Sequence, residues 1–239
     1  MPSPLDFFDR VAIINLPSRP DRLRALGAEL ARIGFDIGNP KVTIPPAPEP
    51  SDADGFPSRG VLGNFLSHLD IIESAWRDGL NNVLVLEDDA IFRAQFRTYP
   101  VAKVLGSQPW DMCFIGHALD LAPHADGFVR TDAPFKWAHC YAVDHSIMPR
   151  LTHYLRKTID RPVGHPAGGK MYIDGAFSLF RQQNPDVISL LSAPCQSSQK
   201  GSPSNLARRR WYDMNSLTRP AVIAARALRD EMWRRSWIA

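Results

Sequence analysis

Asn82-Val-Leu-Val-Leu86 is an apolar run that ends abruptly in three acids, Glu87-Asp88-Asp89. A continuous apolar run of this length is typical of a strand that is buried on both faces in a parallel sheet. Ligands bind outside the carboxyl ends of the strands in an open sheet of this kind. The acids that follow the run are therefore candidate functional residues.

Further apolar strands and amphipathic helices surround this run. The expected strands cover 11–16, 82–86, 111–116, 138–143 and 187–191, and the expected helices cover 21–33, 62–76 and 146–157, with Pro149 in a first turn. The alternation predicts an α/β fold, a mostly parallel sheet flanked by helices. Asn39 to Pro57 holds six prolines and is expected to be a long loop, either a functional lid or a flexible excursion. Too little chain precedes it for a domain linker to be favoured.

The composition is that of a globular protein. The chain has 239 residues, of which 44% are hydrophobic and 22% charged, which excludes a disordered or collagen-like chain. No apolar run reaches the ~18 residues of a membrane-spanning helix, and the first ten residues lack the pattern of a signal peptide. We therefore expect a cytoplasmic location. Three widely spaced cysteines indicate reduced, buried thiols.

Basic residues gather at the C-terminal end. From Asn205 onward there are eight arginines and three acids, a net charge of +5 in a chain whose total is +3. We divide the chain into a domain at 1–205 and a basic helical tail at 206–239. The tail is expected either to lie on an anionic membrane surface, on the inner face of the membrane, or to pack its apolar side on the domain. No nucleic-acid-binding module is recognisable, so no nucleic-acid partner is expected.

The acidic triplet poses an electrostatic problem. At ~5 Å and an effective dielectric constant of ~20, each pair of like charges costs about 3 kcal/mol. In an extended chain Glu87 and Asp89 point to one side, where they could share Mg²⁺ or Mn²⁺, and Asp88 faces another partner. The competing interpretation is a solvated turn whose acids cap the next helix.

Polar residues of two other segments are candidates for the same edge. Asn15, Arg19 and Arg22 follow the first strand, and arginine side chains there could pair with phosphates; a surface ion pair is the alternative for Arg22. Ser67 and His68 lie within the second helix, where His68 lines a pocket or is simply a hydrogen-bonded, half-buried residue. His139, in the expected strand at 138–143, is a second histidine that could line the pocket.

Six segments of the chain resemble, in order, motifs of one enzyme family. They are Val11–Arg22 (I-N-L-x-x-R-x-x-R), Gly60–His68 (G-E-x-G-C-x-x-S-H), Val83–Ala90 (L-V-L-E-D-D), Ala138–Val143 (H-A-Y), Tyr172–Asp174 (P-V-D) and Pro194–Gln196 (P-x-x-Q). The pattern resembles glycosyltransferase family 25, the lipooligosaccharide and procollagen galactosyltransferase type. The sequence departs from it at Val61, Asn64 and Tyr172, where the family has Glu, Cys and Pro.

The resemblance implies a GT-A-like, Rossmann-type fold. It also implies a nucleotide-sugar donor, commonly UDP-galactose, inverting transfer to a saccharide acceptor, and usually Mn²⁺, with Mg²⁺ as the alternative. The acceptor would belong to lipooligosaccharide or another cell-surface glycan, and would be lipid-linked if the tail meets a membrane.

The resemblance also suggests roles for the candidate residues. Glu87 and Asp89 would hold the metal, and the remaining acid, Asp88, would bind the donor. The residues expected to line the donor site with it are Asn15, Arg19, Arg22, Ser67 and His68.

Asp174 is the expected base, with a third metal ligand and a helix N-cap as its alternative roles. Trp110, Trp137 and Tyr141 are expected to be core residues rather than sugar-stacking platforms. The other functions considered are a non-catalytic relative that binds a nucleotide sugar or glycan, and a metal-dependent phosphohydrolase or nucleotidyltransferase that uses the same acids.

Overall fold

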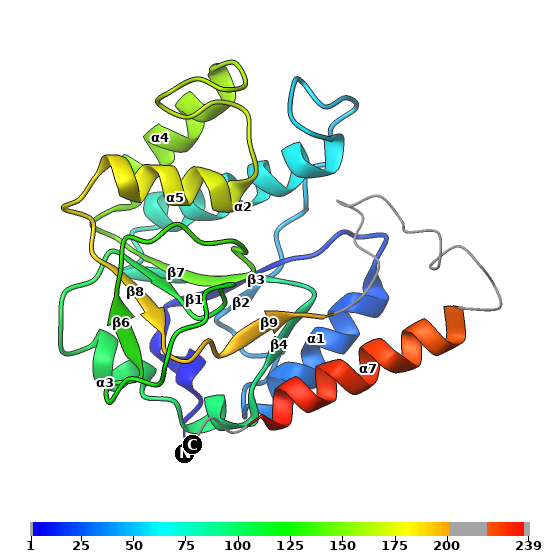
Figure 1. Cartoon of the computed structure of the whole chain (residues 1–239). Helices are drawn as coiled ribbons and strands as arrows, with labels where there is room; N and C mark the ends of the chain where they lie inside the picture. Colours follow the sequence, from blue (N-terminus) through cyan, green and yellow to red (C-terminus); the bar gives the residue numbers. More distant parts are fainter. Residues whose placement is uncertain (1, 201–218, 237–239) are drawn as a thin grey trace.

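The computed structural model describes residues 2–200 and 219–236, in which a seven-stranded sheet lies between two layers of helices (Figure 1). The strand order is β2-β1-β3-β7-β5-β8-β6, and β4 pairs with β9 in a separate small sheet. The strands are β1 (Arg10–Ile14), β2 (Val42–Thr43), β3 (Asn82–Glu87), β4 (Ala90–Phe92), β5 (Met112–Phe114), β6 (Phe128–Arg130), β7 (Cys140–Asp144), β8 (Ser189–Ser192) and β9 (Ser197–Gln199). The helices are α1 (Pro20–Arg32), α2 (Arg59–Arg77), α3 (Val101–Leu105), α4 (Met148–Asp160), α5 (Ile173–Gln183) and α7 (Arg219–Arg235), with 3-10 helices η1 (Pro4–Phe7) and η2 (Ala94–Thr98).

The large sheet is mostly parallel but mixed. Five strands run in one direction, and β7 and β6 run against them. Because β7 is antiparallel to β3, the start of β7 meets the end of β3. The Glu87 N–H donates to the His139 carbonyl at 2.8 Å, one residue beyond the Leu86–Cys140 pair. The end of β3 is thus flanked by residues that precede β7.

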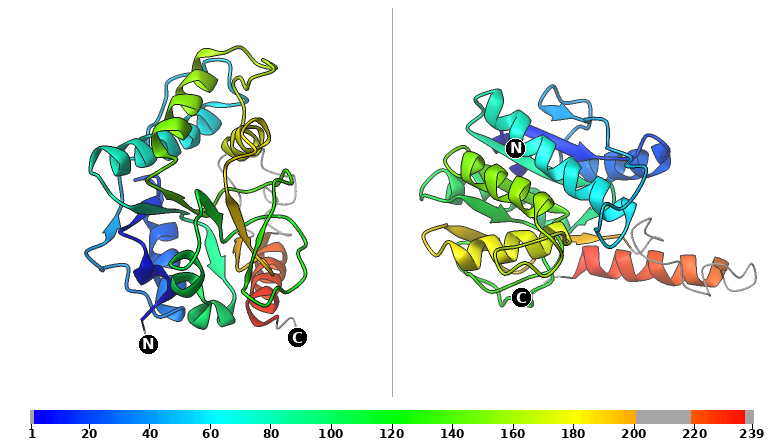
Figure 2. Two further views of the ribbon diagram at one scale, coloured as in Figure 1. Left: turned by 90° about the vertical axis from the view of Figure 1, so that its left-hand side faces the viewer. Right: turned by 90° about the horizontal axis from the view of Figure 1, so that it is seen from above.

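Side chains of β3 alternate between two buried cores. Val83 and Val85 face the layer of α2, α4 and α5, whereas Leu84 and Leu86 face the layer that contains α1 and α3. Figure 2 shows the two layers on opposite sides of the sheet. Burial on both faces is the physical reason for the unbroken apolar run of this strand. The predicted α/β class, a mostly parallel sheet flanked by helices, is confirmed.

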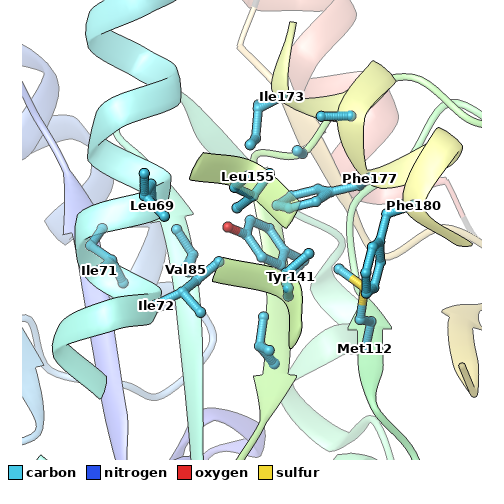
Figure 3. Packing of buried hydrophobic residues seen from close by; sticks show 14 of the residues in the cluster. Leu69, Ile71, Ile72, Val85, Met112, Tyr141, Leu155, Ile173, Phe177 and Phe180 are labelled. Carbon is cyan, nitrogen blue, oxygen red and sulfur yellow. The ribbon is translucent and has the colours of Figure 1, made fainter. Parts of the chain in front are cut away.

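Aliphatic and aromatic side chains together fill the core beneath α2, α4 and α5 (Figure 3). Tyr141 of β7 and Phe177 of α5 pack edge to face, with their ring centroids 4.9 Å apart. Tyr141 is fully buried, and Trp110 is 7% exposed in the opposite core, so both are core residues as expected. Trp137 is 39% exposed, so its assignment to the core is wrong; it lies in the irregular segment between β6 and β7, where its φ is positive.

Three segments differ from the pattern expected. Residues 173–177, which lie outside the expected helices, form the first turn of α5 despite Gly175. Burial of Phe177 and Phe180 in the core outweighs the low helix propensity of that glycine. The expected loop at 39–57 contains the short strand β2, and the segment that follows the last expected strand contains β9. Both strands have too few residues to show a period.

The described part of the tail packs on the domain. Arg234 of α7 forms an ion pair with Glu29 of α1, and each side chain is 11% exposed. Arg93 lies over the ring of Trp233, with its guanidinium carbon 4.8 Å from the ring centroid. Of the two interpretations of the tail, packing on the domain is the one seen in residues 219–236; residues 206–218 lie outside the described residues. Among the residues described, none of the helices has the length and apolarity needed to cross a bilayer.

Candidate functional site

Glu87 ends β3, and its carboxylate is held by donors from two other elements. Its Oε1 accepts hydrogen bonds from Asn64 Nδ2 at 2.9 Å and His68 Nε2 at 3.2 Å, both on α2. Its Oε2 accepts one from Gln199 Nε2 of β9 at 3.1 Å. Burial alone would raise the pKa of Glu87, but the contacts with His68 and Asn64 lower it to about 2. Glu87 is therefore an ionised and firmly oriented carboxylate at neutral pH.

His68 links Glu87 to the core of the protein. The ionised carboxylate can only accept, so His68 Nε2 carries the hydrogen that it donates to Glu87. Its other ring nitrogen, Nδ1, lies 2.9 Å from the hydroxyl oxygen of Tyr141. Burial holds the pKa of Tyr141 well above its usual value, so this hydroxyl keeps its proton. Because His68 is fully buried, its effect on a ligand would pass through Glu87.

Asp88 faces the β1–α1 segment. Its Oδ2 accepts a hydrogen bond from Asn15 Nδ2 at 2.7 Å, and its Oδ1 accepts one from Arg22 Nη1 at 2.9 Å. Asn15 Nδ2 also donates to the carbonyl of Arg19 at 3.1 Å. Burial raises the pKa of Asp88, although the charge of Arg22 opposes that shift. The structure thus brings Asn15 and Arg22 to the acidic triplet, as their position after the first strand predicts.

Asp89 is the least satisfied of the three acids. Its Oδ2 lies 3.9 Å from Arg22 Nη1, and its Oδ1 is buried with no hydrogen-bond partner. Burial and the neighbouring charge of Glu87 raise the pKa of Asp89 to about 7. An unpartnered buried carboxylate oxygen is costly unless a cation or a donor reaches it. Of the three carboxylates, that of Asp89 would therefore gain most from a positively charged partner.

The expected alternation of side-chain direction along Glu87, Asp88 and Asp89 does not extend beyond Glu87. Asp88 and Asp89 lie in a turn between β3 and β4 rather than in the strand. Arg22 consequently contacts both of them, whereas Glu87 turns toward α2 and β9. The alternative of a solvated helix cap does not hold for Asp88, which is 9% exposed and is followed by β4.

Two predicted donor-site residues make other contacts. Arg19 pairs with its neighbour Asp21 through two hydrogen bonds of 3.0 and 2.9 Å on the surface. The Ser67 hydroxyl donates to the Gly63 carbonyl of its own helix at 2.9 Å and is buried. The structure therefore places neither side chain in contact with the acidic triplet.

Asp174 lies at the N-terminal end of α5, which Figure 1 shows on the side of the sheet where β3 ends. Its Oδ2 accepts a hydrogen bond from the Trp137 N–H at 3.0 Å, and its Oδ1 accepts one from the Gly175 N–H at 2.8 Å. The N-cap of α5 is Tyr172, so the N-cap role considered for Asp174 is wrong. The remaining roles, base and metal ligand, stay open.

His139, a candidate pocket residue of the expected H-A-Y strand, is a buried polar group beside the triplet. His139 lies opposite Glu87 in the β3–β7 ladder; its Nε2 is 3.2 Å from Ser197 Oγ, and its Nδ1 has no partner. A Cβ at Gly116 would lie 2.3 Å from His139 Nε2, so only glycine leaves room for this ring. Burial lowers the pKa of His139 to about 4. Gln199, which binds Glu87, was not among the expected site residues, because no sequence pattern marks it.

The residues described contain no cluster of three or more His, Cys, Asp or Glu side chains arranged to hold a metal ion. The donor chemistry nevertheless fits a hard cation at one point, because Asp89 Oδ1 is an oxygen without a partner. Glu87 would join such a site only by exchanging one of its three hydrogen bonds.

Comparison with known proteins shows a related sequence. The chain is 32% identical over 106 residues to a human protein named "inactive glycosyltransferase 25 family member 3", a match that covers 38% of this chain and 18% of the human protein. The resemblance to glycosyltransferase family 25 is thereby confirmed. The chain spans about a fifth of the length of this curated relative. No protein-family model matches the chain.

Solved structures with a similar arrangement include two transferases. A glycosyltransferase involved in the glycosylation of the major capsid of PBCV-1 matches 93% of this chain and 99% of its own, with 10% identity and a TM-score of 0.49. A mannose-1-phosphate geranyltransferase from Thermus thermophilus matches 79% of this chain and 75% of its own, with 11% identity and a TM-score of 0.46.

Proposed function

We propose that this chain is a glycosyltransferase of the family 25 type, which moves galactose from UDP-galactose to a saccharide acceptor of lipooligosaccharide or another cell-surface glycan, with inversion. The observation that supports the proposal is the acidic turn after β3. Asn15 and Arg22 hold Asp88 there, Glu87 is ionised, and Asp89 keeps a buried oxygen without a partner. Carboxylates at the carboxyl end of a strand can bind a ligand that carries a divalent cation, such as the metal complex of a nucleoside diphosphate.

A divalent ion, Mn²⁺ or Mg²⁺, would be held by Asp89, with Glu87 as the second ligand. When bound, the ion would stabilise the negative charge that develops on the departing diphosphate. Asp88 would bind the donor nucleotide, oriented by Asn15 and Arg22. Arg19 and Ser67 are proposed for the donor site only if binding rearranges their present contacts.

Asp174 is our candidate for the base that takes the proton of the acceptor hydroxyl as it attacks the anomeric carbon. Each of its oxygens accepts one backbone N–H bond, which orients the carboxylate and leaves lone pairs for a substrate. The rival role, third metal ligand, predicts that Asp174→Asn weakens binding of Mn²⁺ and UDP. The role of base predicts a fall in turnover with donor affinity preserved.

The first experiment follows donor consumption. Purified protein with UDP-galactose and Mn²⁺ should release galactose slowly in the absence of acceptor, and Asp89→Ala should abolish the release. Asp126→Ala, at an exposed acid elsewhere, is the matched control and should keep it. Undiminished release by Asp89→Ala would remove the metal assignment, and cleavage within the diphosphate would instead indicate a phosphohydrolase or nucleotidyltransferase.

A non-catalytic relative is the second candidate, because the human protein that this chain resembles is named inactive. A binding protein would keep the oriented Asp88 and bind UDP-galactose without releasing sugar. Calorimetric titration with UDP-galactose, run beside the release assay, separates the two. Tight binding with no release over many hours would favour the binding protein.

We further propose that α7 places the enzyme on the inner face of a membrane that carries a lipid-linked acceptor. Leu228 and Met232 are 63% and 65% exposed on this helix, and Arg235 is 76% exposed beside them. An apolar strip flanked by arginine favours an anionic bilayer surface. Leu228→Gln with Met232→Gln should reduce sedimentation with anionic vesicles; equal partitioning of wild-type and variant protein would refute the contact.

A further inference from the structure

Trp137 has an unusual backbone conformation for a bulky residue. Its φ is +73°, in the left-handed region, and its side chain is 39% exposed. A large side chain is rarely found there because its Cβ crowds the backbone. Such residues persist where the surrounding structure holds them, and they cluster at ligand-binding sites.

Asp174 is the group that holds this conformation. Its Oδ2 accepts the Trp137 N–H at 3.0 Å, which ties the strained peptide to the first turn of α5. Tyr172, the N-cap of the same helix, is 50% exposed. Among the described residues, three aromatic side chains stand out as exposed. One of them, Trp137, is hydrogen-bonded through its backbone to Asp174, and another, Tyr172, precedes Asp174 by two residues.

This pair lies beside the acidic edge. The Trp137 ring is 6.1 Å from the ring of His139, and the His139 carbonyl accepts the N–H of Glu87. The end of α5 that carries Tyr172 lies on the same side of the sheet as the end of β3 (Figure 1). The third exposed aromatic, Trp76, is at the other end of α2 from the residues that bind Glu87.

We propose that Trp137 and Tyr172 form the acceptor subsite, on which a pyranose ring packs, with Asp174 accepting hydrogen bonds from its hydroxyls. The C–H face of a pyranose is apolar, and a rigid aromatic ring covers it with little loss of side-chain freedom. The inference rests on the proposed transferase function and extends it from donor to acceptor. Trp137 is then a specificity-determining residue whose strained backbone is kept because it presents the indole outward.

The test uses Trp137→Gly, because glycine adopts a positive φ without strain. The variant should keep the melting temperature of the wild-type protein or raise it, and should keep the rate of galactose release from UDP-galactose without acceptor. Transfer to lactose and to deacylated lipooligosaccharide should show a KM raised roughly tenfold or more. Trp137→Phe retains a ring and should recover most of the affinity, and Trp76→Ala should match the wild-type protein in every assay.

Three outcomes would overturn the subsite. One is an unchanged KM in Trp137→Gly, and another is a fall in its melting temperature large enough to account for the loss of transfer. The third is a wild-type protein that hydrolyses the donor but binds neither saccharide at millimolar concentration. Absence of donor hydrolysis in the wild-type protein would instead count against the proposed transferase function, so the two failures are distinguishable.

Discussion

Replacing Gly116 by Ala tests the packing that surrounds the acidic edge. The new Cβ would lie 2.3 Å from His139 Nε2 and 2.6 Å from its Cε1, whereas ordinary contacts are about 3.5 Å. The imidazole must therefore move by about 1 Å, although it is fully buried. Overpacking of this kind costs about 1–3 kcal/mol, and loss of the bond to Ser197 adds about 1 kcal/mol.

Gly116→Ala is expected to destabilise the protein, whereas a Gly→Ala substitution without a clash would stabilise it. The φ of Gly116 lies outside the left-handed region, so alanine would normally stabilise by about 0.4–1 kcal/mol through the unfolded chain. We expect a net loss of about 2–3 kcal/mol in the free energy of unfolding. With an m-value of about 3 kcal/mol/M, the urea midpoint, followed by tryptophan fluorescence, falls by roughly 1 M.

Two comparisons separate the clash from a general effect of alanine. Gly27→Ala in α1 would make only ordinary contacts, with the new Cβ at 3.4 Å or more from Ile37, and should stabilise by up to about 1 kcal/mol. In the His139→Ala background, Gly116→Ala should lose most of its cost, a coupling of at least about 1 kcal/mol. A Gly116→Ala protein as stable as the wild type would refute the reasoning.

Other predictions concern pH, the tail and the base. The pKa of His139 is lowered by burial from 6.5 to about 4, so its neutral form stabilises the fold fully above pH 6.5 and that stability is lost as the pH falls toward 4. Urea unfolding should show the wild type losing about 3 kcal/mol more than His139→Gln between pH 7 and pH 4; parallel losses would contradict this. Arg234→Met should lower the free energy of unfolding by about 2 kcal/mol in thermal unfolding, because it leaves the buried carboxylate of Glu29 unpaired. Arg235→Met, at a 76% exposed side chain, should change it by no more than about 0.5 kcal/mol. Equal effects of the two substitutions would argue against docking of α7 on the domain. Asp174→Asn keeps an acceptor for the Trp137 N–H, so kcat should fall about 100-fold or more at constant acceptor KM. Asp174→Ala removes that acceptor and should also raise the acceptor KM. Identical kinetics in the two variants would show that the hydrogen bond from Asp174 does not position the Trp137 side chain.

Much of the fold follows from local patterns. The apolar run before Glu87 predicts β3, and apolar residues three and four apart predict α1 and α2, because each pattern reflects burial of the element that carries it. The shortest strands show no such hydrophobic pattern in the sequence. The strands β2 and β9 contain two and three residues, and their pairing depends on neighbours distant in the chain.

Local sequence patterns alone predict that three acids follow a buried strand, and that Asn15 and Arg22 lie near them at the carboxyl edge of the sheet. Local periodicity suffices for this, since the direction of parallel strands places such residues together. The donors that hold Glu87 are brought to it by the fold, because Asn64 and Gln199 are 23 and 112 residues away along the chain. The reversed direction of β7 and the left-handed backbone of Trp137 likewise arise from contacts between distant segments, for which a sequence pattern has no periodic signature.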